Sequence, residues 1–170
     1  MVGSLNYLTT TRPDISYSIN ILSQFMANPL EVHWNVAKRV LWYLQGSISF
    51  GIEYTNHLNV ELIGYSDFDW AGDPDDRKST ISYAFNIGSS VVSWTSKKQP
   101  TISLSSTEAK YKAMCSATCE AIWLKRIFED MGQKQDGATP IKCDNQSKSR
   151  WPIIQFIMQD QSTLKLNIIL

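Results

Sequence analysis

Apolar side chains recur at helical spacing through the first third of the chain. Pro13 suits a first helical turn, and the apolar residues after it fall three or four positions apart, on one face: Ile15, Ile19, Leu22 and Met26. Asn28 and Pro29 end this helix, and a second apolar stripe runs from Glu31 to Gln45 before Gly46 stops it. The pattern predicts an N-terminal helical hairpin.

Short runs of β-branched and aromatic residues then replace the helical spacing. They predict strands over residues 60–66, 79–87 and 91–96, with a turn at Gly88-Ser89-Ser90 between the last two. Three consecutive strands with short connections form an antiparallel meander.

The residues Ser105 to Glu108 have the Ser-x-x-Glu spacing of a capping box and predict the start of a helix. Helical periodicity persists to Met131, a length that suggests two helices broken around residues 116–119. A fourth strand is expected over 140–143. This order predicts an α/β fold (α+β) with a mixed sheet, in which the helical crossover pairs the first and fourth strands in parallel.

Three acidic residues mark the ends of the predicted elements. Asp67 follows the first strand, Glu108 lies in the first turn of the helix, and Asp144 follows the fourth strand. Parallel pairing would bring Asp67 and Asp144 side by side. Carboxylates suit Mg²⁺, and two ions held about 4 Å apart promote in-line hydrolysis of phosphodiesters. Glu108 has a competing role as a structural cap, and the sequence leaves both roles open.

The segments around these acids resemble the ribonuclease H (RNase H) domain in the Pol polyprotein of copia-type LTR retrotransposons. In the family's order they read IGYSDFDWAGDPDDRKST, SWTSKKQPTISLSSTEAKYKAM, CEAIWLK and CDNQS. The residues before them resemble the thumb and connection region of reverse transcriptase. The resemblance implies hydrolysis of the RNA strand of RNA–DNA hybrids at a two-ion Mg²⁺ or Mn²⁺ site, with Asp67, Glu108 and Asp144 as the metal-binding catalytic carboxylates.

Three segments are expected on this basis: a helical thumb and connection remnant over 1–56, an incomplete RNase H-like domain over 57–147, and an aberrant tail over 148–170. After CDNQS the family continues with an alanine-rich helix, then a strand and a closing helix that carry a fourth metal ligand. This chain reads KSRWPIIQFIMQDQSTLKLNIIL instead. The closing strand and helix are expected to be missing, as are the polymerase palm and the rest of the polyprotein.

An inactive relic is therefore the favoured interpretation of this chain. An active RNA–DNA hybrid ribonuclease and a non-catalytic nucleic-acid-binding module are the alternatives. The 16 basic and 16 acidic residues give zero net charge, so a nucleic acid would meet only a local basic patch. Lys97, Lys98 and Gln99, in the loop expected after the third strand, are the candidates for contact with the hybrid backbone, and solvation alone is the other interpretation.

Cysteine usage and the termini bear on the compartment. Cys115, Cys119 and Cys143 are odd in number and form no metal-type cluster, so buried thiols in a reducing compartment are favoured over zinc or a disulfide. The sequence has neither a signal-peptide pattern nor an apolar run long enough to span a membrane. We expect an intracellular location, cytoplasmic or nuclear, and no membrane partner.

A frameshift near Ser147 would explain the tail. Codons exist for Lys148 to Ile169 such that the same nucleotides, read from the third base of the Lys148 codon, spell IAMANNPIHHARPVNIEIKYH. That string contains the Asn-Pro, His-x-Arg and Ile-x-Ile-x-Tyr-His elements of the family segment. We expect genomic DNA sequencing to find this string encoded in the alternative frame; a frame that encodes nothing similar contradicts the frameshift hypothesis.

Overall fold

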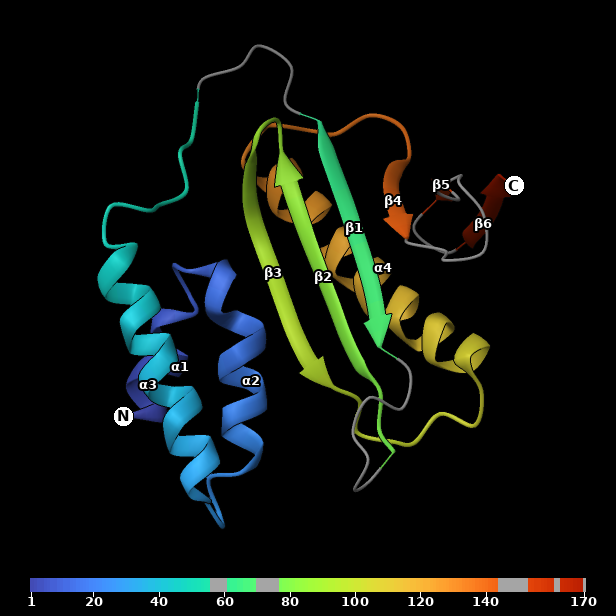
Figure 1. Ribbon diagram of the computed structural model, residues 1–170. Helices are drawn as coiled ribbons and strands as arrows, with labels where there is room; N and C mark the ends of the chain where they lie inside the picture. The colour runs from blue at the N-terminus through green and yellow to red at the C-terminus, as the bar shows by residue number, and fades with distance from the viewer. Residues whose placement is uncertain (56–60, 70–76, 144–152, 161–162, 170) are drawn as a thin grey trace. The chain divides into compact units, whose positions relative to one another are not determined.

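The chain folds into two compact units (Figure 1). The computed structural model describes residues 1–55, 61–69 and 77–143, and the backbone of residues 153–160 and 163–169. The first unit comprises residues 1–53 together with 95–97, and the second comprises residues 54–94 and 98–170.

The first unit is helical. Its elements are α1 (Val2–Leu8), a 3₁₀ turn η1 (Pro13–Ile15), α2 (Ser16–Gln24) and α3 (Glu31–Gly46). The expected hairpin of α2 and α3 is confirmed, and α1 adds a helix that the periodicity did not indicate. The helices share one buried cluster: Leu5, Ile15, Ile19, Leu22, Ala37 and Val40.

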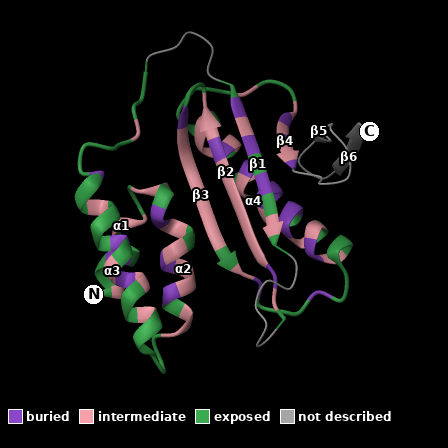
Figure 2. Cartoon of the chain, in the orientation of Figure 1, coloured by how far each residue is buried: buried purple, intermediate pink, exposed green. Residues whose placement is uncertain are grey.

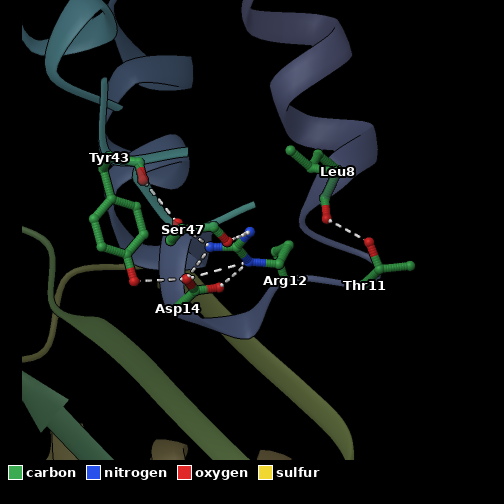
Figure 3. Close-up of polar contacts among 6 residues, drawn as sticks. All are labelled: Leu8, Thr11, Arg12, Asp14, Tyr43 and Ser47. Atoms are coloured by element: carbon green, nitrogen blue, oxygen red, sulfur yellow. Dashed lines mark hydrogen bonds and ion pairs between the residues drawn. The ribbon is translucent and has the colours of Figure 1, made fainter. Parts of the chain in front are cut away.

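A polar network ties the start of η1 to the end of α3 (Figure 3). The Arg12 guanidinium donates to both carboxylate oxygens of Asp14, at 2.9 and 2.7 Å, and to the carbonyl and hydroxyl oxygens of Ser47, at 3.1 and 2.7 Å. The Tyr43 hydroxyl also donates to Asp14, at 2.8 Å. The hydrogen bond from Arg12 is the main cause that lowers the pKa of Asp14. The network joins residues far apart in sequence and so fixes the path of the loop before η1.

The second unit is built on a mixed sheet. Its strands are β1 (Leu62–Asp69), β2 (Thr80–Ile87), β3 (Ser90–Lys98), β4 (Thr139–Cys143), β5 (Ile153–Asp160) and β6 (Thr163–Ile169), in the spatial order β3-β2-β1-β4-β5-β6. β1 pairs antiparallel with β2 and parallel with β4, which confirms the predicted mixed sheet and its parallel crossover pair.

The helix α4 (Ser106–Asp130) makes the crossover and packs on one face of the sheet (Figure 1). Four alanines at four-residue spacing form a buried ridge along it: Ala109, Ala113, Ala117 and Ala121. Small side chains let the helix axis approach the strands closely. Beside this ridge, the core cluster combines side chains from the helix and three strands: Leu62, Phe85, Ile141, Met114 and Leu124.

The predicted break around residues 116–119 is wrong, because α4 is one continuous helix. Ala117 is fully buried, and the Thr118 hydroxyl donates to the Met114 carbonyl one turn earlier at 2.7 Å. That bond satisfies the hydroxyl within the helix, so the polar stretch does not compete with the backbone.

The expected absence of a fifth strand is also wrong. β5 adds antiparallel to β4, with Ile141 opposite Ile154, and β6 adds antiparallel to β5. The sequence explains the strands, since apolar and β-branched residues dominate residues 153–160 and alternate with polar ones over 163–169. Within the described part of the chain, no helix follows β4.

Gly64 in β1 leaves no room for a side chain beside Phe85 of β2. It is buried opposite Phe85, and a Cβ atom at this position would lie 2.5 Å from the Cε1 atom of the fully buried Phe85 ring.

We expect Gly64→Ala to lower the free energy of unfolding by about 1–3 kcal/mol, because the ring has no room to withdraw. Urea unfolding followed by tryptophan fluorescence and circular dichroism measures the change. Gly51→Ala is the matched control, because its new methyl group would meet nothing within 4 Å; equal stability of the two variants contradicts the prediction.

Candidate metal-binding carboxylates

Asp67 lies within β1 and not beyond its end. The strand continues to Asp69, so the predicted end at residue 66 is wrong; the ladder with β2 extends through the pairs Asp67–Ser82 and Asp69–Thr80. The Asp67 carboxylate is exposed, and its Oδ1 atom accepts a hydrogen bond from the Phe68 backbone N–H at 2.8 Å.

The alternation along β1 decides which way Asp67 faces (Figure 2). Leu62, Gly64 and Ser66 are buried on the side that α4 covers, whereas Tyr65 and Asp67 are exposed. Because successive strand residues point to opposite faces, the Asp67 side chain projects from the face of the sheet opposite α4.

Glu108 caps the helix that it belongs to. Its backbone N–H donates to the Ser105 hydroxyl at 3.1 Å, and its Oε2 atom accepts the Leu104 N–H at 2.7 Å. A standard capping box would bond the carboxylate to the N-cap residue itself, Ser105, and here it reaches one residue further back. Of the two roles that the sequence left open, the structure displays the capping role.

Lys112, one turn along α4, forms an ion pair with the other oxygen of the same carboxylate at 2.8 Å. Lys112 also donates to Thr101, Ile102 and Ser103, at 3.1–3.3 Å, and so holds the loop before α4 against the helix. The ion pair with Lys112, followed by the Leu104 hydrogen bond, lowers the pKa of Glu108. Sequence reasoning missed this lysine, although the Glu-to-Lys spacing of four residues on a helix is a known signal.

Asp144 lies outside the described residues. The register of the parallel pair places Ser66 beside Cys143, the residues directly before Asp67 and Asp144. The approach of the two carboxylates remains a prediction. Across the described ranges, no group of three or more His, Cys, Asp or Glu side chains is arranged to hold a metal ion.

The three candidates for nucleic-acid contact differ in exposure. Lys97 is exposed and Lys98 is half-buried, and both belong to β3 rather than to the loop after it. Gln99 is only 2% exposed; its amide nitrogen donates to the Ala109 carbonyl at 3.2 Å and its amide oxygen accepts from the Ser103 hydroxyl at 2.7 Å. Gln99 therefore holds the loop to α4, and its side chain does not reach solvent.

Comparison with known proteins shows which family the chain is related to. A retrovirus-related Pol polyprotein from transposon RE2 of Arabidopsis thaliana is 44% identical over 85% of this chain, and one from transposon TNT 1-94 of Nicotiana tabacum is 40% identical over 86%. The chain belongs to the copia-type retrotransposon Pol family. A protein named secreted RxLR effector protein 161, from Plasmopara viticola, is 49% identical over 72% of this chain and 87% of its own length.

The chain spans 10% and 11% of the length of the two Pol polyproteins. No protein-family model matches it, and no solved structure does. In the described residues, no helix is both long and apolar enough to cross a membrane.

The Lys112 ion pair gives a testable pKa. We expect Lys112→Met to raise the pKa of Glu108 toward its ordinary value of 4.5, because the largest cause of its lowering is removed. A lowered folded-state pKa stabilises the fold above the unfolded value, and that contribution disappears as pH falls through the folded value. Lys112→Met should therefore lose less stability on acidification than the wild type does.

NMR titration of the Glu108 side-chain carboxyl carbon measures this shift. Lys110→Met is the matched control, since Lys110 is nearer in sequence and no ion pair joins it to Glu108. A Glu108 pKa that moves equally in both variants would contradict the assignment.

Proposed function

We propose that residues 57–147 are the RNase H-like domain of a copia-type Pol polyprotein and that this chain has lost hydrolytic activity. The strand order supports the first part: an antiparallel meander, a crossover helix and a parallel fourth strand follow one another as the family's fold requires. The family membership supports it independently.

The observation that supports the loss of activity is that both carboxylate oxygens of Glu108 already have partners. One of its carboxylate oxygens accepts the Leu104 N–H and the other pairs with the Lys112 ammonium. A cation that binds this carboxylate must compete with the cap and with the Lys112 ammonium for its two oxygens. The described residues, as arranged, do not fit a two-ion site.

Without Glu108, Asp67 and Asp144 are the remaining candidates and would supply at most a pair of ligands. A hard cation such as Mg²⁺ keeps several waters but relies on carboxylates to hold it between substrate phosphates. The family's fourth acidic ligand lies in the segment that residues 148–170 replace here. Asp67 and Asp144 alone therefore lack the partners that a two-ion mechanism requires.

A hydrolysis assay tests this proposal. We expect no cleavage of a labelled RNA–DNA hybrid, in Mg²⁺ or Mn²⁺, above the level of an Asp67→Asn variant. The conservative variant keeps the shape of the exposed strand residue, and circular dichroism confirms that both proteins fold. Metal-dependent cleavage that Asp67→Asn abolishes would overturn the loss of activity and establish the hybrid ribonuclease.

A gel shift with the same protein preparation distinguishes an inactive relic from a non-catalytic nucleic-acid-binding module. A relic is expected to bind the hybrid weakly and without saturation, in keeping with its zero net charge. Saturable binding without metal would identify a nucleic-acid-binding module. Lys97→Ala, which removes an exposed cation, would then be expected to weaken it.

A further inference from the structure

Two thiols lie one turn apart on the outer face of α4. Cys115 and Cys119 are both exposed, which shows that the expectation of buried thiols is wrong for this pair, whereas Cys143 is buried as expected. The continuous helix makes them neighbours, because residues four apart on an α-helix share a face. The pKa of the Cys119 thiol is raised first by partial desolvation and then by Cys115, so the two groups interact.

We propose that Cys115 and Cys119 form a two-coordinate site for a soft, thiophilic cation, with Cu(I) as its chemical type. This site lies outside the carboxylate set and does not depend on the proposed function.

Helix geometry favours a bridging ion over a disulfide. Residues four apart on a helix have Cβ atoms about 5–6 Å apart, whereas a disulfide needs about 3.5–4.5 Å. Closing one would distort α4 next to its buried alanine ridge. An ion between the sulfur atoms, with metal–sulfur bonds of about 2.3 Å, spans the wider gap without moving the backbone.

The surroundings limit the site to two ligands. Glu120 adjoins Cys119 in sequence, but its carboxylate accepts hydrogen bonds from the Ser93 hydroxyl at 2.5 Å and the Tyr83 hydroxyl at 3.2 Å, on the sheet side of the helix. A structural zinc site takes four ligands, and the part of the chain described here offers no group of even three. Soft thiolate ligands select Cu(I). This ion also accepts coordination by only two ligands.

The flanking residues suit a soft ion as well. Tyr111 and Trp123 lie one turn before and one turn after the pair, about half exposed. By helix spacing they share the exposed face of α4 with the two cysteines, and neither position brings a competing carboxylate.

Binding involves no change of oxidation state. Each thiol loses its proton as a sulfur–copper bond forms, so one Cu(I) and two thiols yield a dithiolate complex and two protons. Affinity is therefore expected to fall as pH is lowered.

Copper competition tests the proposal on the full, reduced chain without oxygen. Cu(I) is supplied as its bicinchoninate complex, and loss of that complex's colour reports transfer to the protein. We expect one equivalent bound per monomer, and at least a tenfold loss of affinity in Cys115→Ser and in Cys119→Ser. Cys143→Ala, at the buried cysteine, should bind as the wild type does.

Moving one thiol to another position tests whether the spacing of the pair, and not only the number of thiols, determines copper binding. Adding Tyr111→Cys to Cys119→Ser restores a pair at four-residue spacing and should recover binding. Adding Ser116→Cys to Cys119→Ser restores the number of thiols at the wrong spacing and should not. Undiminished binding in the single variants, failure of the Tyr111→Cys relocation, or a copper-dependent dimer would each overturn the proposal.

Discussion

The packing of α4 on the sheet is the interaction on which the second unit depends. The alanine ridge brings the helix close to the strands, and Met114 and Leu124 then meet Leu62, Phe85 and Ile141 in one core. Because β1 and β4 are parallel, only a crossover of this kind can connect them. Each buried Å² of apolar surface contributes about 25 cal/mol, so this face supplies the main driving force for bringing distant strands together.

The same packing constrains the candidate chemistry. α4 takes the inner face of β1, which leaves Asp67 on the outer face, and its first turn needs a cap, which Glu108 provides. Lys112 then serves both the cap and the preceding loop. The candidate metal-binding carboxylates thus lie beside groups that hold the fold, and structural contacts already engage Glu108.

Sequence periodicity predicted most of the elements, because apolar spacing reports directly which face is buried. It predicted the hairpin of α2 and α3, the meander, and the parallel return of β4. It failed for features that depend on residues distant in sequence or on hydrogen bonds made by individual polar side chains. The end of β1 depends on Thr80 across the ladder, the continuity of α4 on the Thr118 hydroxyl, and the burial of Gln99 on Ala109 and Ser103. The exposure of Cys115 and Cys119 likewise follows from which helix face meets the sheet.

Residues 148–170 illustrate that pairing of strands makes weaker demands on the sequence than a metal site does. An unpaired strand edge exposes a row of backbone donors and acceptors, and any extended segment of suitable pattern can satisfy them. β5 does so for β4, and β6 extends the sheet. Pairing of backbones requires only β propensity and alternation of apolar and polar residues, whereas a metal site requires a carboxylate at one particular position. A segment of unrelated sequence can therefore extend a sheet far more readily than it can supply a metal ligand.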